Sequence, residues 1–140
     1  MSDNSNRSFF DVYAQEYDLL TNAEVRRQGH AREVEAIIER TDPQRVLDAG
    51  CATGLTARLF ADRGIEATGL DRSPRMIELA RDGGQSSGPP LTFTVGEFEA
   101  LPNEFDERFD LVVCLANAIT GVRTLAGLRR ALSGFHRVLE

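Results

Sequence analysis

Asp48, Gly50, Cys51 and Gly54 lie close together just after a short apolar segment of this sequence. Two glycines four residues apart let the backbone turn sharply and approach a ligand with no Cβ atom in the way. The free N–H groups of a helix starting at Leu55 would point at the same ligand. The segment therefore predicts a binding site, and an ordinary turn between a strand and a helix is the alternative.

A second acid, Asp71, follows the next apolar segment, 21 residues after Gly50. This is about the spacing at which an acid binds the ribose hydroxyls in nucleotide-binding folds. A carboxylate has two oxygens and can accept a hydrogen bond from each of two neighbouring hydroxyls. A cap on the following turn is the alternative for Asp71. Arg72 could contact a phosphate or be a solvated surface residue.

Alternating strands and helices are predicted to position these residues. The predicted strands are 45–49, 66–71, 91–95 and 109–115, and the predicted helices are 23–40, 55–63, 74–81 and 123–139. Ser73 can cap the third of these helices, and Pro74 suits its first turn. Leucines and a phenylalanine recur on one stripe of the last helix, from Leu125 through Leu132 to Leu139, which predicts a core-facing side. The order predicts an α/β fold, a Rossmann-like parallel sheet with helices on both faces. Ligands of such sheets bind at the carboxyl ends of the strands.

Composition narrows the function classes. The chain has 140 residues and a net charge of −6, which suits one domain over 9–140 after a disordered stretch at 1–8 and disfavours nucleic acid or an anionic membrane as partner. No apolar run approaches the ~20 residues of a membrane span. Two cysteines in apolar surroundings predict reduced thiols in a cytoplasmic protein, and no metal-ligand spacing is present.

Four segments together resemble the successive motifs of the class I S-adenosylmethionine-dependent methyltransferases. They are VLDAGCATG, GLDRSPRMIELA, TVGEFEALP and FDLVVCLANAI, in this order. The resemblance covers about 13–140. It implies that S-adenosylmethionine is the cofactor and that a methyl group is transferred to a small-molecule acceptor.

The resemblance also implies residue roles at the methionine end of the cofactor. Asp48 and Gly50 would face the methionine part, with Cys51 and Gly54 in the same stretch. The segment 115–117, beginning at Leu115, would line the reacting end.

At the adenosine end, the resemblance implies that Asp71 binds the ribose hydroxyls. Arg72 and Met76 would flank the adenine, and Glu97 would accept from its amino group. The backbone N–H of Phe98 would meet the ring.

Two positions depart from the family pattern. Ala52 stands where the family usually has a second glycine, and alanine would be strained at a positive φ. Glu97 is one methylene longer than the usual aspartate. The competing nicotinamide fingerprint needs glycine at position 52 and glycine or alanine at Leu55, so an NAD(P)-dependent oxidoreductase is the weaker alternative.

Other residues have open interpretations. Tyr13 and Tyr17 would either close over the cofactor or pack in the core. Asn117 resembles the segment after the fourth strand of glycine N-methyltransferase-type enzymes, and a helix cap is its alternative. His30 is interpreted as a solvated helix residue. The sequence identifies no catalytic base.

Family members usually continue beyond the position of Glu140 with further strands. The fourth strand would then be left as an open edge, and open edges invite pairing with another chain. We therefore expect either a fragment of a longer enzyme or a homodimer formed through this strand. A module that binds the cofactor without catalysis is the main functional alternative.

Overall fold

The computed structural model describes residues 9–140, so the stretch 1–8 predicted to be disordered lies outside the described residues. The helices are α1 (Phe9–Val12), α2 (Tyr17–Leu20), α3 (Ala23–Thr41), α4 (Leu55–Ala61), α5 (Pro74–Asp82) and α6 (Leu125–Val138). The strands are β1 (Arg45–Ala49), β2 (Glu66–Asp71), β3 (Leu91–Val95) and β4 (Leu111–Val113). Short 3-10 helices are η1 (Phe98–Ala100), η2 (Asn103–Phe105) and η3 (Ala118–Gly121).

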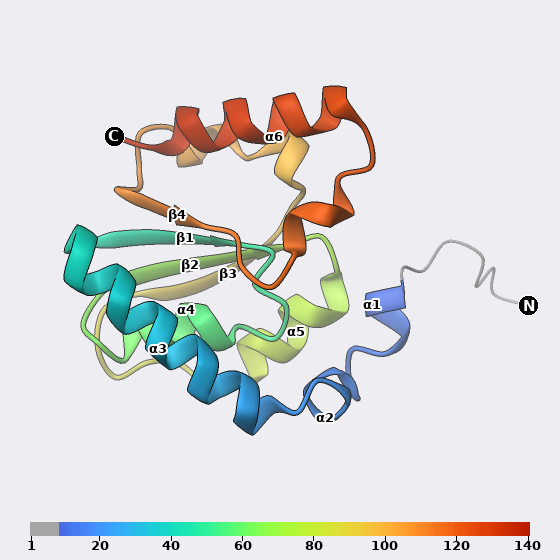
Figure 1. Cartoon of the computed structure of the whole chain (residues 1–140), viewed down its shortest axis with the longest axis vertical. Helices are drawn as coiled ribbons and strands as arrows, with labels where there is room; N and C mark the ends of the chain where they lie inside the picture. The colour runs from blue at the N-terminus through green and yellow to red at the C-terminus, as the bar shows by residue number, and fades with distance from the viewer. Residues whose placement is uncertain (1–8) are drawn as a thin grey trace, which may run out of the picture.

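The four strands form one parallel sheet in the order β3-β2-β1-β4. In the register, Asp48 of β1 lies beside Gly69 of β2 on one side and beside Val113 of β4 on the other. All four carboxyl ends therefore point the same way, and the loops that follow them meet at one end of the sheet (Figure 1). The predicted Rossmann-like parallel sheet is confirmed.

Helices cover both faces of the sheet (Figure 1), with α3, α4 and α5 on one face and α6 on the other. Side chains that alternate along β1 pack into two different hydrophobic clusters. Val46 belongs to the cluster that includes Val34 and Phe60. Leu47 belongs to the cluster that includes Phe109 and Val138. Such burial on both faces explains the nearly continuous apolar runs of the strands.

The start of α5 follows from its sequence. The hydroxyl of Ser73 accepts a hydrogen bond from the backbone N–H of Met76 at 3.2 Å, and Pro74 occupies the first turn. Both features stabilise a helix start. This cap fixes α5 directly after β2 and so places its first turn beside the strand ends.

The predicted fourth strand is wrong in its bounds, because β4 covers only Leu111–Val113. Phe109 instead forms an isolated parallel bridge with Leu139. Beyond β4 the chain turns through Ala116 and Asn117, whose φ angles are 53° and 62°. Two consecutive residues in the left-handed region are incompatible with a strand.

The predicted core-facing stripe of α6 is also wrong in part. Leu125 and Leu132 are 67% and 55% exposed. The buried positions are instead the small residues Gly127 and Ala131, together with Val138. Small side chains let α6 approach η1 and its neighbours closely, which leaves the larger leucines outside.

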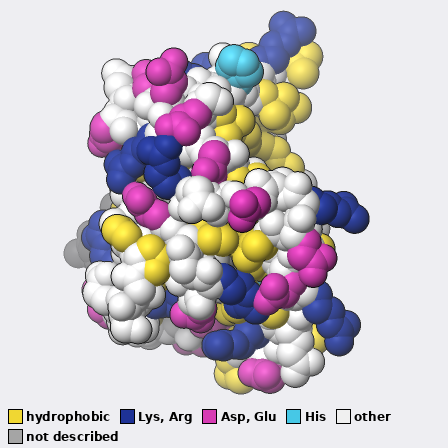
Figure 2. Space-filling view, turned by 90° about the vertical axis from the view of Figure 1, so that its left-hand side faces the viewer, with side chains coloured by type: hydrophobic (Ala, Val, Ile, Leu, Met, Phe, Trp, Pro, Cys, Tyr) yellow, Lys and Arg dark blue, Asp and Glu magenta, His cyan; other side chains and the backbone are white. Residues whose placement is uncertain are grey.

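The end of the sheet where the strands begin carries acidic and basic side chains of both signs side by side (Figure 2). One such pair joins Arg108 and Glu66 at 3.6 Å. Within 9–140, no helix combines the length and the apolar character that crossing a membrane requires. This end of the molecule lies opposite the loops that form the candidate site.

Candidate functional site

A cavity of about 350 Å³ lies at the carboxyl ends of the strands. This is within the usual size range of small-molecule sites. Loops that follow all four strands contribute to its wall, and so does α2; these parts include Gly50, Asp71, Glu97, Leu115 and Tyr17. Residues far apart in the sequence thus meet where the fold predicts a ligand.

Three further residues predicted for the adenosine end also line this cavity: Arg72, Met76 and Phe98. Met76 is buried and presents a soft apolar surface. The ring of Phe98 packs edge-on against Phe135 of α6 at a centroid distance of 5.9 Å. The opposite layer of the protein therefore supports this wall of the cavity.

A second cavity of about 30 Å³ adjoins the first and shares Tyr17, Gly50 and Leu115 with it. Two further predicted residues of the first loop, Asp48 and Cys51, line it. A space of this size holds one or two water-sized groups. It therefore suits a small polar group at the end of a larger ligand.

Asp48 is a buried acid without a full set of partners. Its Oδ2 atom has no hydrogen-bond partner among the described residues. Burial raises the pKa of Asp48 to about 7, the backbone N–H of Ala57 partly opposes this, and the charge of Asp71 adds to it. A cationic group in the small cavity would favour the ionised carboxylate.

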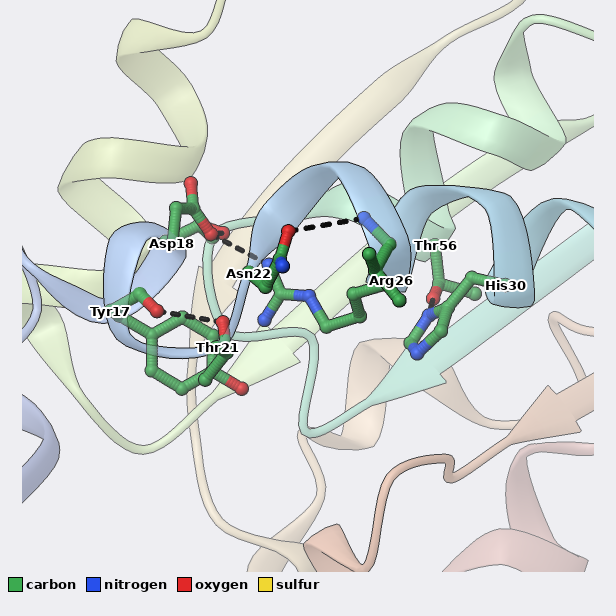
Figure 3. A network of polar contacts seen from close by, with 9 residues as sticks. Tyr17, Asp18, Thr21, Asn22, Arg26, His30 and Thr56 are labelled. Atoms are coloured by element: carbon green, nitrogen blue, oxygen red, sulfur yellow. Dashed lines mark hydrogen bonds and ion pairs between the residues drawn. The ribbon is translucent and has the colours of Figure 1, made fainter.

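Arg26 of α3 lines the same small cavity, although no sequence pattern had pointed to it. Its Nη2 atom donates to Oδ1 of Asp18 at 2.6 Å, and its guanidinium lies 4.8 Å from the centre of the Tyr17 ring (Figure 3). Its Nε atom is buried and has no hydrogen-bond partner among the described residues. Two residues that line the small cavity, Arg26 and Asp48, thus each hold a buried polar atom, one a donor and one an acceptor, that has no hydrogen-bond partner within 9–140.

Asp71 is held between two backbone segments. Its Oδ2 atom accepts from the N–H of Ala52 at 3.0 Å, and its Oδ1 atom accepts from the N–H of Ser73 at 2.9 Å. The turn-capping role given as the alternative is therefore real. Each carboxylate oxygen can accept about two hydrogen bonds, so Asp71 keeps acceptor capacity at the cavity wall.

Glycine is required at Gly50 and at Gly54 of the first loop because different side chains lie close to each position. Gly50 has a φ of 84°, and a Cβ atom there would lie 2.5 Å from the Cβ atom of Ala118. Gly54 lines neither cavity, and a Cβ atom there would lie 2.6 Å from the ring of Phe93. Ala52 has a φ of 47°, so the strain expected for a departure from glycine is present in the loop.

The environment of His30 differs from the one predicted from the sequence. It is partly buried, and its Nδ1 atom lies 2.7 Å from the hydroxyl oxygen of Thr56 on α4 (Figure 3). Burial lowers the pKa of His30, and Arg26 lowers it further, while Glu33 raises it. The prediction of a solvated helix residue is wrong because the packing of α3 on α4 turns His30 toward the small cavity.

The structure also places the residues that had open interpretations. Tyr17 lines both cavities, whereas Tyr13 is 45% exposed and packs at a tilt against Phe9, with a centroid distance of 4.7 Å. Asn117 lines the main cavity and also stands at the N-cap position of η3, where its side chain makes no capping hydrogen bond. Phe10, an aromatic residue of the segment 9–20 that was expected to form a short helix or a lid, also lines the main cavity.

Neither cysteine is suited to act as a nucleophile. Burial raises the pKa of Cys51 well above its ordinary value, and burial raises the pKa of Cys114 to about 11. A thiol must lose its proton to attack or to bind a metal. Both thiols therefore stay protonated at neutral pH.

Comparison with known proteins agrees with this geometry. Residues 46–140 match the family model described as a methyltransferase domain. The demethylmenaquinone methyltransferase of Thermotoga maritima is 34% identical over 94% of this chain and 55% of its own length. The malonyl-[acyl-carrier protein] O-methyltransferase of Pseudescherichia vulneris is 36% identical over 94% of this chain and 47% of its own.

Among solved structures, an amino pentose methyltransferase from Micromonospora echinaspora with S-adenosylmethionine bound superposes with a TM-score of 0.69. It is 28% identical, and the match covers 98% of this chain and 55% of that one. The chain spans about half the length of the curated relatives named above. The matched domain, the parallel sheet and the cavity at its strand ends agree, and the chain belongs to the family of S-adenosylmethionine-dependent methyltransferases.

Proposed function

We propose that this protein binds S-adenosylmethionine in the two adjoining cavities and transfers its methyl group to a small molecule. The observation that carries the proposal is that Arg26 and Asp48 line the small cavity and that Nε of the one and Oδ2 of the other are buried without a partner among the described residues. An α-amino acid group carries one carboxylate and one ammonium. These would satisfy the donor and the acceptor respectively.

The main cavity fits the rest of the cofactor. Asp71 keeps acceptor capacity for ribose hydroxyls, and Met76 with Phe98 offers apolar surface for a purine. Glu97 lines the same wall, where it would accept from the amino group of the adenine. The strand-end position of the cavity is the usual one for nucleotides in such sheets.

The bound cofactor would supply an electrophilic methyl group on a sulfonium. The chain's own residues would then orient the acceptor behind that methyl group. Leu115, Asn117 and Tyr17 line the part of the main cavity that we assign to the acceptor. Orientation alone can lower a barrier by about 7–11 kcal/mol in favourable cases. We assign no catalytic base.

A small-molecule acceptor agrees with the relatives and with the charge. The relatives include, by their names, enzymes for demethylmenaquinone and for an amino pentose. The net charge of −6 disfavours a nucleic-acid acceptor. Phe10 and Tyr17, which line the cavity, can pack against an organic ring.

Methyl transfer tests the proposal directly. The protein would be incubated with S-adenosylmethionine labelled in its methyl group and with panels of phenols, amines and carboxylic acids. Label in an organic product supports catalysis. Cofactor binding with no label in any product would favour the alternative of a binding module.

We also propose a cytoplasmic location, because both cysteines, Cys51 and Cys114, are free thiols.

A homodimer that pairs two copies along β4 is a further proposal. Its support is the sheet order, in which β4 is an outer strand. A monomer in sedimentation at high protein concentration would contradict the dimer.

A further inference from the structure

The turn between α2 and α3 brings Asp18 against Arg26. The carboxylate of Asp18 accepts from Nη2 of Arg26 at 2.6 Å, and the neighbouring Tyr17 places its ring under the same guanidinium at 4.8 Å (Figure 3). The Arg26 side chain is only 15% exposed, whereas that of Asp18 is 51% exposed. Two consecutive residues of α2 therefore fix one largely buried cation of α3.

Local hydrogen bonds hold this turn in shape. The hydroxyl of Thr21 donates to the carbonyl of Tyr17 at 2.7 Å. Asn22 takes a left-handed φ of 50°, and its side chain accepts from the N–H of Val25 at 3.4 Å. The backbone of Arg26 donates to the carbonyl of Asn22 at 3.0 Å. The side chain of Arg26 consequently points back toward α2 (Figure 3).

Asp18 also joins α2 to the loop that follows β1. The hydroxyl of Thr53 donates to Oδ1 of Asp18 at 2.9 Å. The preceding residue, Ala52, donates its N–H to Asp71 at 3.0 Å. Hydrogen-bonded groups therefore run from Arg26 through Asp18 and this loop to the acid assigned to the ribose.

The bond to Asp18 occupies one end of the Arg26 guanidinium. Arg26 lines the small cavity, and its Nε atom has no hydrogen-bond partner in the part of the chain that the structure describes. An arginine held in one geometry loses less freedom when it binds a carboxylate than a mobile one does. We propose that Asp18 is a positioning residue that holds Arg26 ready for the carboxylate in the amino-acid half of the cofactor. This inference rests on the proposed function.

Two ligands separate the amino-acid half from the rest of the cofactor. S-adenosylhomocysteine contains the amino-acid group, and 5′-methylthioadenosine keeps the adenosine and the sulfur but lacks it. Replacement Asp18→Ala should weaken S-adenosylhomocysteine binding about three- to fivefold, because a half-exposed ion pair contributes modestly. Binding of 5′-methylthioadenosine should change less than twofold, since that ligand does not reach Arg26.

Matched variants control the test. Glu16→Ala removes an equal charge two residues away, where the side chain makes no cap to α2, and it should change neither affinity. Asp18→Asn keeps an oxygen that can accept from Arg26 and Thr53, so it should restore part of the affinity. In an Arg26→Ala background, Asp18→Ala should cause no further loss for S-adenosylhomocysteine. Binding of 5′-methylthioadenosine also shows that each variant is folded.

Three results would overturn the positioning role. One is an equal loss of affinity for both ligands, which would mean that Asp18 supports the whole loop after β1 and does not act on Arg26 alone. Another is tighter binding of S-adenosylhomocysteine by Asp18→Ala, which would make Asp18 a competitor for Arg26. The third is unchanged affinity for S-adenosylhomocysteine. If the unaltered protein binds neither ligand, the proposed function fails as well, so the two failures are distinguishable.

Discussion

Replacing Asp48 by asparagine should change how stability depends on pH. Burial raises the pKa of Asp48 from its ordinary value of 3.8 to about 7 in the folded protein. An acid with a raised pKa favours the folded state below its unfolded pKa, and this contribution is lost as the pH rises to the folded pKa. This shift in pKa corresponds to a loss of about 4 kcal/mol in the free energy of unfolding over the full pH range.

The measurable part of this effect lies between pH 5 and pH 8. With the two pKa values above, Asp48 should lower the free energy of unfolding by about 2.5 kcal/mol across this interval. Asp48→Asn removes the titration but keeps an oxygen for the N–H of Ala57. Urea unfolding of both proteins at several pH values gives the comparison. Between pH 5 and pH 8, the free energy of unfolding of the variant should rise by about 2.5 kcal/mol relative to that of the unaltered protein.

An exposed acid supplies the control. Asp82 ends α5 at the surface, so Asp82→Asn removes the same charge at an exposed position and serves as the matched replacement in the urea unfolding series. The ligand gives a second readout, because an ammonium prefers the ionised carboxylate. Affinity for S-adenosylhomocysteine should rise about tenfold from pH 6 to pH 8 in the unaltered protein only. Parallel pH profiles for Asp48→Asn and the unaltered protein would refute the reasoning.

Further predictions concern the first loop and its neighbours. Asp71→Ala removes a charged acceptor and should weaken S-adenosylhomocysteine binding about ten- to hundredfold in calorimetry, while an unchanged affinity would remove its ribose role. Gly54→Ala should lower the free energy of unfolding by about 2–4 kcal/mol, through the left-handed backbone and the clash with the Phe93 ring. Gly29→Ala is its control, because a Cβ atom meets nothing within 4 Å there, and it should stabilise α3 by up to about 1 kcal/mol. Ala52→Gly relieves a φ of 47° and should not lower stability in urea unfolding; a loss above about 1 kcal/mol would contradict the strain.

The sheet could be predicted because its signals are local. The bounds expected for the first three strands, from Arg45, Glu66 and Leu91 onward, are those observed. Each is a short segment that contains apolar or β-branched residues and ends at an acid or just before a glycine. The cap at Ser73 was equally readable from sequence, because capping needs only residues within one turn.

The features missed depend on contacts between distant segments. Arg26 and His30 reach the small cavity only because of the turn at Asn22 and the packing of α3 on α4. No periodicity in the sequence encodes that crossing. In α6, the large leucines suggested the wrong buried face, because close approach to η1 requires small residues such as Gly127.

The most direct test of the cofactor assignment is a calorimetric titration of the chain with S-adenosylhomocysteine and, separately, with NAD. The orphaned atoms of Asp48 and Arg26 and the acceptor capacity of Asp71 predict one-to-one binding of S-adenosylhomocysteine and no heat from NAD. Binding of NAD without binding of S-adenosylhomocysteine would contradict the account.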